Sequence, residues 1–403
     1  MHDDPYNLRP TSINRLRAVL IWILLAVSAM PMGGWLCSLV LSDATMLLQF
    51  VAFVPRWIWA LLAAIPLVPV IILVGPRLRF RPAAAAGSTA RPSAIPVRTA
   101  RVFVAAMCLI TLHVLLVDLR LTNMFRSQPA GPSLAIGQWN LSMGDTEPWT
   151  GSLPKTLGPA GSGTLPQVYL LTTNQRITPF NQMVATLQED GKPWKAHRKK
   201  IFTIITHLPV KSTRELALPR AAPLPGTVSK RQRWEDLYNS MADKVGINRR
   251  VFTGVTEADM MEIVLDATSI IGREVVIWFI DLPSDPFLSR DEVAESIRTW
   301  LIAEQAKPNG LRQPDLVVGD CNIPRNCRSL DTMLKAAGRP MTHGFDQAGW
   351  GIAATWPLGH PILHIDHAFT APTLEVTSYN LRRTPVSDHY AQVFELVATD
   401  KGK

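Results

Sequence analysis

An uninterrupted apolar run near the N-terminus constrains the fold of this chain more than any other feature. Residues 18–41 contain no charged side chain, and about 20 apolar residues span the hydrocarbon core of a bilayer. The run is too long for the core of a signal peptide, and no small-residue cleavage site follows it. Two further apolar runs lie at 57–75 and 102–117. The sequence therefore predicts a membrane anchor, residues 18–117, with three transmembrane helices.

Arginines predict the orientation of these helices. The loop at 76–101 carries six arginines and no acidic residue, whereas Arg56 is the only basic residue of the loop at 42–56. Positively charged loops stay in the cytoplasm. Residues 1–17 and the 76–101 loop are therefore expected inside, and everything after about 118 outside. If the organism is bacterial, the protein is a multi-pass inner-membrane protein with a periplasmic C-terminal domain. The segment at 43–56 is too short to span, and we expect it to lie in the membrane interface or to dip into the membrane.

The hydropathy pattern changes after residue 131. Residues 118–131 are expected to be a linker, and residues 132–398 a separate domain. Short apolar runs typical of strands occur at 134–139, 167–171, 201–206, 274–280, 315–319, 362–365 and 390–396. Helical spacing of apolar residues predicts a helix over 290–305, capped by Ser289, and a second helix is predicted over 327–337. Strands mixed with helices indicate an α/β or α+β fold.

Polar residues stand at the ends of several of these runs. The segment 316–322 reads Leu-Val-Val-Gly-Asp-Cys-Asn. If the strand continues, Asp320 and Asn322 lie on one face because strand side chains alternate. Gly, Asp and Asn are also typical of turns, so a plain turn is the alternative. Asn140 follows the run at 134–139, Asp366 and His367 follow the run at 362–365, and Ser387-Asp388-His389 precedes the run at 390–396.

These four motifs, in their order along the chain, resemble the endonuclease/exonuclease/phosphatase superfamily over roughly residues 132–398. That order is Asn140, then Asp320 with Asn322, then Asp366-His367, then Ser387-Asp388-His389. The resemblance implies a four-layer β-sandwich of the DNase I-like type, with its site at one end, that hydrolyses phosphate esters with Mg²⁺ or Mn²⁺. It implies that Asp320 activates water, Asn322 donates to a phosphate oxygen, and His389 contacts the phosphate or acts as a base. Asp366 would fix the His389 tautomer, and Asn140 and Asp388 would lie near the metal. His364 and His367 match no such role and are expected to serve local packing.

Two positions depart from the family pattern. Members of the family usually end their second strand in a glutamate that binds the metal, and Thr173 falls at that position. Many members place His or Tyr after the strand corresponding to 274–280, where this chain has Asp281. A carboxylate facing a phosphate is repulsive unless a cation lies between them. Asp281, Asp145 or Glu147 could therefore supply the missing metal ligand.

Three hypotheses follow from the motifs and their gaps. The domain is an active metal phosphodiesterase, a catalytically degenerate domain that still binds anions, or a membrane-anchored scaffold for a partner protein. Polar residues at several strand ends are not needed to hold a sandwich together, which argues against the scaffold. The substrate, a nucleic acid or a lipid head group, is left open.

Charge and cysteine content add two further alternatives. The net charge is +9 and the pI is about 9.6, which favours anionic partners. The basic segment 191–250 is either a footprint for a polyanion or membrane surface or a set of solvated faces. Cys321 and Cys327 either form a disulfide or remain buried thiols.

Overall fold

The computed structural model describes residues 10–78, 95–126, 131–141, 157–158, 165–172, 178–220, 257–357, 359–383 and 387–399. Contacts divide the chain into two compact units. A helical unit comprises Met1–Leu41 and Val54–Leu119, and a larger unit comprises Ser42–Phe53 and Arg120–Lys403. The segment between the first two apolar helices therefore belongs to the larger unit, where the sequence predicted only an interfacial segment.

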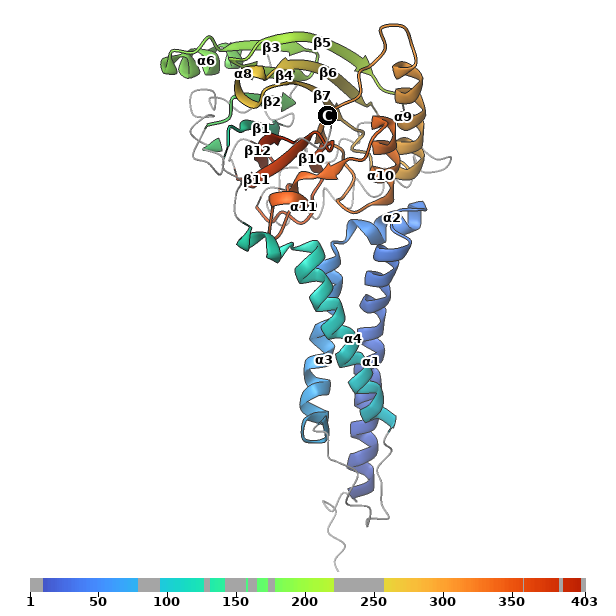
Figure 1. Ribbon diagram of the computed structural model, residues 1–403. Coiled ribbons are helices and arrows are strands. Elements are labelled where there is room, and N and C mark those ends of the chain that lie inside the picture. Colours follow the sequence, from blue (N-terminus) through green and yellow to red (C-terminus); the bar gives the residue numbers. More distant parts are fainter. Residues whose placement is uncertain are drawn as a thin grey trace, which may run out of the picture. The chain divides into compact units, whose positions relative to one another are not determined.

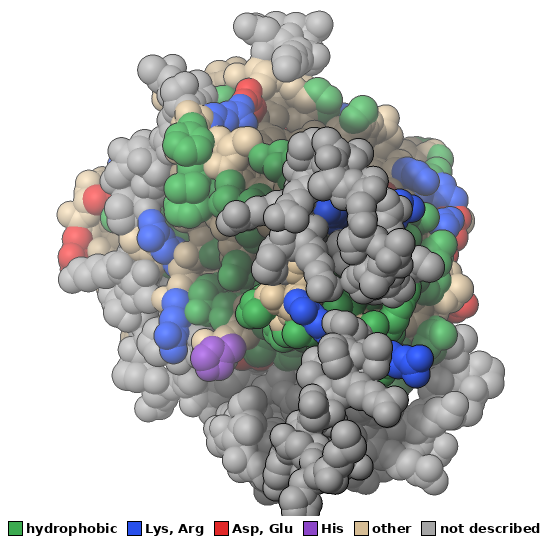
Figure 2. Space-filling model, turned by 90° about the horizontal axis from the view of Figure 1, so that it is seen from below, with side chains coloured by type: hydrophobic (Ala, Val, Ile, Leu, Met, Phe, Trp, Pro, Cys, Tyr) green, Lys and Arg blue, Asp and Glu red, His purple; other side chains and the backbone are tan. Residues whose placement is uncertain are grey.

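Three long apolar helices form the helical unit. They are α1 (Pro10–Val40), α3 (Arg56–Leu78) and α4 (Ile95–His113), and α4 continues into the π-helical turn η1 (Val114–Asp118). The stretches Arg15–Val40, Arg56–Val74 and Arg98–Asp118 are long and apolar enough to cross a membrane, close to the predicted bounds. Large apolar side chains remain exposed along all three helices, including Leu20, Leu61 and Leu109. Hydrophobic side chains make up much of the coloured surface in the view of Figure 2.

Arg56 connects three helix ends within this unit. Its Nη2 donates to the carbonyl of Ser38 near the end of α1, at 3.2 Å. Its Nη1 lies 3.6 Å from Oδ1 of Asp118 at the end of η1. The end of the first helix, the start of the second and the end of the third therefore lie together.

Two six-stranded sheets form the core of the larger unit (Figure 1). The first has the order β11-β12-β1-β2-β4-β3, and the second has the order β5-β6-β7-β8-β10-β9. The strands of the first sheet are β1 (Leu134–Asn140), β2 (Val168–Thr172), β3 (Lys195–Lys199), β4 (Phe202–Thr206), β11 (Leu374–Arg382) and β12 (Ala391–Ala398). Those of the second are β5 (Val210–Ala217), β6 (Asp259–Asp266), β7 (Glu274–Asp281), β8 (Leu316–Asp320), β9 (Thr342–His343) and β10 (Asp366–Thr370).

Three apolar clusters fill the spaces between four layers. The cluster between the sheets contains inward side chains such as Ile136, Phe279 and Val318. On the outer face of the second sheet, Trp278 packs with α9 (Arg290–Gln305) and α10 (Arg328–Leu334). On the outer face of the first sheet, Tyr169 packs with α6 (Thr178–Leu187). This arrangement is the predicted four-layer sandwich, because each sheet buries both faces.

The shorter elements complete the described part of the larger unit. They are α2 (Met46–Phe53), η2 (Leu121–Phe125), η3 (Gln188–Asp190), α8 (Thr268–Ile271), η5 (Lys335–Ala337) and α11 (Gly344–Ala348). η2 lies in the predicted linker and is tied to the domain, since Asn123 Nδ2 donates to the Gly349 carbonyl at 2.8 Å. This part of the predicted linker therefore packs against the domain.

The predicted helices agree with α9 and with α10 followed by η5. Ser289 caps α9 by accepting a hydrogen bond from the amide of Glu292. Six of the seven predicted strand runs correspond to strands. The run at 362–365 was wrong: Leu363 forms only an isolated bridge with Trp356, and the strand begins at Asp366. β3, β5, β6, β9 and β11 were not predicted.

Gly319 allows the two central strands of the second sheet to approach closely. Its φ is +136°, and a Cβ at this position would lie 2.0 Å from the carbonyl oxygen of Ile280. No side chain fits there, and an L-residue rarely adopts this backbone conformation. The glycine therefore brings the ends of β7 and β8 together, where Asp281 and Asp320 stand.

Candidate active site

A row of four aspartates crosses one end of the second sheet. Adjacent strands pair Asp259 with Asp281, Asp281 with Asp320, and Asp320 with Asp366. Side chains alternate between the two faces along a strand. On each strand the aspartate points to the same face as the apolar side chains that fill the space between the sheets. Neighbouring strands lie about 4.8 Å apart. The four carboxylates therefore stand side by side and face the first sheet.

Polar side chains from elsewhere reach three members of this aspartate row. Lys200 stands at the turn between β3 and β4, and its Nζ donates to both carboxylate oxygens of Asp259 at 2.7 Å. Asn140 Nδ2 donates to Oδ2 of Asp320 at 2.8 Å. Asp366 Oδ2 accepts from Nδ1 of His389 at 2.8 Å. Asp281, which is partly exposed, has no such partner among the described residues.

His389 stands between two aspartates. Its Nδ1 contacts Asp366, and its Nε2 lies 3.8 Å from Oδ2 of Asp320. Its backbone is fixed as well, because its amide donates to Ser387 Oγ and its carbonyl accepts from Trp139 Nε1, both at 3.0 Å. The contact between Asp366 and His389 expected from the sequence is therefore present.

The same neighbours determine the charge states of this pair. Burial lowers the pKa of His389, but Asp366 and then Asp320 outweigh it and raise the pKa to about 10. Burial and the charge of Asp366 raise the pKa of Asp320 to about 7. Burial and then Asp320 raise the pKa of Asp281 well above its usual range. Near neutral pH the site thus holds a protonated imidazole beside a carboxylate that titrates there.

Asn322 does not point where the sequence predicted. β8 ends at Asp320, and Asn322 has a φ of +48°, so strand alternation does not extend to it. Its amide donates to Asp320 Oδ1 at 2.8 Å, and its Nδ2 donates to the carbonyl of Leu282 at 2.9 Å. The segment is thus a turn closed by the aspartate, and the turn holds Asn322 against the loop that follows β7.

Comparison with known families places this geometry in context. A sequence model of the Endonuclease/Exonuclease/phosphatase family matches residues 176–389, which is more than half of the chain. The chain belongs to the endonuclease/exonuclease/phosphatase family. A search of curated proteins by sequence found no match.

Solved structures of this family resemble the domain at low sequence identity. One from Bacteroides vulgatus is 14% identical, with a TM-score of 0.44, and the match covers 66% of this chain and 99% of that one. The human Nocturnin catalytic domain with bound sulfate is 13% identical, with a TM-score of 0.43 and coverages of 69% and 99%. Sphingomyelinase C from Streptomyces griseocarneus is 12% identical, with a TM-score of 0.38 and coverages of 66% and 99%.

The last residue of β2, Thr172, lies beside Asn140 of β1. Asn140 pairs with Thr172, and Thr172 shares the inward parity of Val168 and Leu170. Its side chain is buried, and its Oγ1 has no hydrogen-bond partner among the described residues. Thr172 therefore faces the aspartate row. Thr173, Asp145 and Glu147 lie outside the described residues.

The donor set around the aspartate row fits a hard divalent cation. Oδ1 of Asp366 and Oδ1 of Asp388 are buried without hydrogen-bond partners among the described residues. Carboxylate oxygens of Asp320 and Asp366 lie within 4.8 Å of each other, whereas His389, the third member of that group, is protonated and offers no lone pair. Unpaired carboxylate oxygens are the ligands that Mg²⁺ and Mn²⁺ prefer. Asp281 and Asp388 do not belong to that close group, and Asp388 Oδ2 accepts from Trp356 Nε1 at 3.1 Å.

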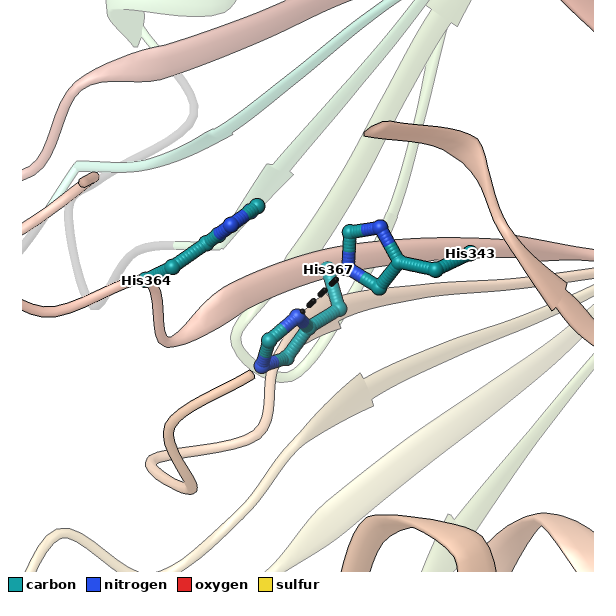
Figure 3. A group of neighbouring side chains, drawn as sticks. All are labelled: His343, His364 and His367. Atoms are coloured by element: carbon teal, nitrogen blue, oxygen red, sulfur yellow. Dashed lines mark hydrogen bonds between the residues drawn. The ribbon is translucent and has the colours of Figure 1, made fainter. Parts of the chain in front are cut away.

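A second cluster, His343, His364 and His367, is buried beside the site (Figure 3). The Phe345 amide donates to His343 Nδ1, so the His343 proton is on Nε2 and is donated to His367 Nδ1 at 2.8 Å. His367 Nε2 then donates to the Ile323 carbonyl, also at 2.8 Å.

The hydrogen bonds of this histidine cluster disfavour metal binding. Both ring nitrogens of His343 and of His367 are engaged, whereas a metal ligand must offer a lone pair. Burial lowers the pKa of His367 to about 4 and those of His343 and His364 well below their usual range, which keeps the rings neutral. The cluster ties β10, beside Asp366, to the turn after Asn322. This agrees with the expectation that His364 and His367 serve local packing.

The remaining expectations concern the basic segment and the cysteines. Several of the described lysines and arginines of 191–220 pair with acids on different elements, as Lys211 does with Glu274 and Arg214 with Glu304. This favours solvated faces for that part, and residues 221–256 lie outside the described residues. Cys321 and Cys327 are buried and form no disulfide, so the disulfide alternative was wrong.

Sequence reasoning missed three site residues. Asp259 begins β6 and had no predicted role, and Lys200, which precedes β4, was predicted only as part of the basic segment 191–250. Trp356, which holds Asp388, lies in an irregular loop with no motif. An aspartate at the edge of an apolar run, as at Asp281, was the one available signal for Asp259.

Proposed function

We propose that this protein is a membrane-anchored, metal-dependent hydrolase of phosphate esters. The observation that carries the proposal is the charge arrangement of the aspartate row. Lys200, Asn140 and His389 each approach one aspartate, which leaves Asp281 without a basic or amide partner among the described residues. Adjacent buried carboxylates are costly unless a cation compensates them. A bound divalent cation, held by residues of the row, would relieve that cost.

The proposed metal ligands are Asp281 and Asp388, with Asn140 nearby. A bound divalent cation would neutralise the phosphate charge and stabilise the charge that develops in the transition state. It would also remove the repulsion between Asp281 and a bound phosphate. The charge of Asp281 would thus substitute for the carboxylate that Thr173, at the family's glutamate position in the sequence, cannot supply.

The remaining residues have proton-transfer and binding roles in this proposal. Asp320 accepts a proton from the attacking water, and a pKa of about 7 suits a base at neutral pH. His389, protonated through Asp366, contacts a phosphate oxygen as a cation. Asn322 uses one amide hydrogen on Leu282, and the second can be donated to the phosphate. The retained acid–base pair favours the active hydrolase over the degenerate and scaffold hypotheses.

The proposed topology places the hydrolase domain outside the cytoplasm, at the bacterial inner membrane. The segment Ser42–Phe53 belongs to the same unit as the domain, so both must be on one side of the bilayer. The arginine-rich loop 76–101 is then on the cytoplasmic side with the N-terminus. In a bacterial host, alkaline phosphatase fused to the C-terminus should be active, and green fluorescent protein fused there should be dark. The reverse pattern would overturn the topology.

The substrate class is tested with the full chain in phospholipid nanodiscs. Bis(p-nitrophenyl) phosphate, DNA, RNA and sphingomyelin are each assayed over a Mg²⁺ and Mn²⁺ series. Metal-dependent hydrolysis of at least one substrate supports the hydrolase. No turnover together with no metal binding by calorimetry would establish the degenerate domain.

A further inference from the structure

The segment between the first two apolar helices is built into the hydrolase domain. Its helix α2 (Met46–Phe53) buries Gln49 completely and places Ala52 in the apolar cluster of α9 and α10. The ring of Phe50 packs edge-on against Phe287, with centroids 6.2 Å apart. A buried glutamine amide needs specific partners, so this contact is directional as well as apolar.

Gln49 holds one loop by both ends of its amide. Its Nε2 donates to the carbonyl of Pro286 at 2.9 Å, and its Oε1 accepts from the amide of Arg290 at 2.8 Å. Pro286 belongs to the stretch that joins β7 to α9, and Arg290 is the first residue of α9. A side chain that satisfies a backbone acceptor in a loop and the backbone donor at the loop's end fixes that loop in one conformation.

A second attachment lies a few residues earlier. Ser42 Oγ accepts from the amide of Arg328 at 3.1 Å, and Asp43 Oδ1 accepts from the amide of Ser329 at 3.2 Å. Ser329 Oγ also donates to Asp43, whose side chain is buried. The segment thus contacts the starts of both α9 and α10.

The loop held by Gln49 borders the aspartate row. It begins directly after Asp281, and the Arg290 guanidinium donates to the carbonyls of Pro283 and Asp285. The amide of Leu282 donates to the Asp320 carbonyl, and the Leu282 carbonyl accepts from Asn322 Nδ2, both at 2.9 Å. Gln49 is therefore connected to the turn that carries Asn322 through the backbone of this loop and the hydrogen bonds of Leu282.

We infer that Gln49 is a positioning residue for the site: α2 holds the loop 282–289, and through it orients Asn322 and Asp281. The hydrolase domain is therefore incomplete without the connection between its first two membrane helices. This inference rests on the proposed function for its kinetic consequence, but its structural consequence can be measured without turnover.

The structural test uses the two buried thiols. In a Cys37→Ser, Cys108→Ser background of the full chain, Cys321 and Cys327 are the remaining cysteines, and both lie in the apolar cluster that contains Ala52. Gln49→Leu removes both hydrogen bonds, and Leu47→Ala, at an exposed position of the same helix, is the matched control. We expect native-state maleimide labelling to accelerate about five-fold or more in Gln49→Leu only. Equal labelling of the two variants would overturn the inference.

The kinetic test separates positioning from a general loss of folded protein. A structural defect lowers the apparent kcat at unchanged KM, whereas a displaced phosphate donor raises KM. We expect Gln49→Leu to raise KM about five-fold, and Asn322→Ala to remove that effect in the double variant. Additive effects of the two substitutions would contradict the inference. If no substrate is turned over, the proposed function fails and the thiol test alone decides the role of Gln49.

Discussion

His389 Nδ1 lies 2.8 Å from Asp366 Oδ2, and the opposite ring nitrogen faces Asp320 Oδ2 at 3.8 Å. The first contact fixes the ring and its tautomer, as a carboxylate does for a working histidine. The second brings a cation next to the proposed base. The two charges support each other, since each stabilises the ionised form of its neighbour.

The hydrolysis rate should depend on pH through this pair. Asp320 must be deprotonated, so kcat/KM should rise as pH rises through about 7. His389 must stay protonated, so kcat/KM should fall through about 10. The rise and the fall of kcat/KM with pH report the titration of Asp320 and His389 as a coupled pair. A bound cation should move the rise to more acidic pH. A rate that falls steadily as pH rises through neutrality would contradict these roles.

Removing the Asp366 charge should act through His389. Asp366 is the largest contribution that raises the pKa of His389, so Asp366→Ala should lower that pKa and shift the alkaline limb toward neutral pH. We expect kcat to fall about 10²-fold near neutral pH. Asp366→Asn removes the same charge but keeps a hydrogen-bond acceptor, so it should also lower the pKa while retaining the ring position. The pKa is read by NMR of the imidazole, and an unchanged value in Asp366→Ala would contradict the arrangement.

Restoring a carboxylate opposite Asn140 should strengthen metal binding. Thr172→Glu places a charge at the buried position where Thr172 Oγ1 has no partner among the described residues. We expect the Kd for Mg²⁺, measured by calorimetry, to fall about ten-fold, which corresponds to about 1.4 kcal/mol. Thr172→Gln has the same size without the charge and should leave the Kd unchanged. Equal effects of the two substitutions would show that Thr172 does not face the metal.

The close approach of β7 and β8 depends on Gly319. Gly319→Ala must fit a methyl group 2.0 Å from the Ile280 carbonyl oxygen at a φ of +136°. We expect a loss of unfolding free energy of at least about 3 kcal/mol. Gly272→Ala, at a φ of +76° with open space around it, should cost only about 1–2 kcal/mol. Chemical denaturation of both variants measures the difference, and similar costs would contradict the close approach.

Much of this fold is readable from local patterns. Apolar runs predicted β1, β8 and β12, and the cap Ser289 marked the start of α9. Strands such as β5, with the sequence Val-Lys-Ser-Thr-Arg-Glu-Leu-Ala, carry too few apolar residues to be recognised, because sheet pairing and not composition stabilises them.

The site was less predictable because it depends on pairing between distant strands. The motifs identified Asp320, Asp366 and His389, but the aspartate row exists only through the register of β6, β7, β8 and β10. The turn at Asn322 and the inward position of Thr172 depend on backbone geometry that a one-residue shift reverses. The burial of Gln49 had no sequence signal, because an apolar segment between two spans is typical of a membrane interface.

The most direct test of the proposed hydrolase compares wild type with Asp320→Ala in the same Mg²⁺ and Mn²⁺ series. The assay uses the full chain in nanodiscs with bis(p-nitrophenyl) phosphate. Asp266→Asn, at the opposite end of β6 from Asp259, is the matched control. We predict metal-dependent hydrolysis in wild type and control, and a loss of at least about 10²-fold in Asp320→Ala. Metal-dependent hydrolysis that survives in Asp320→Ala would contradict the proposed site.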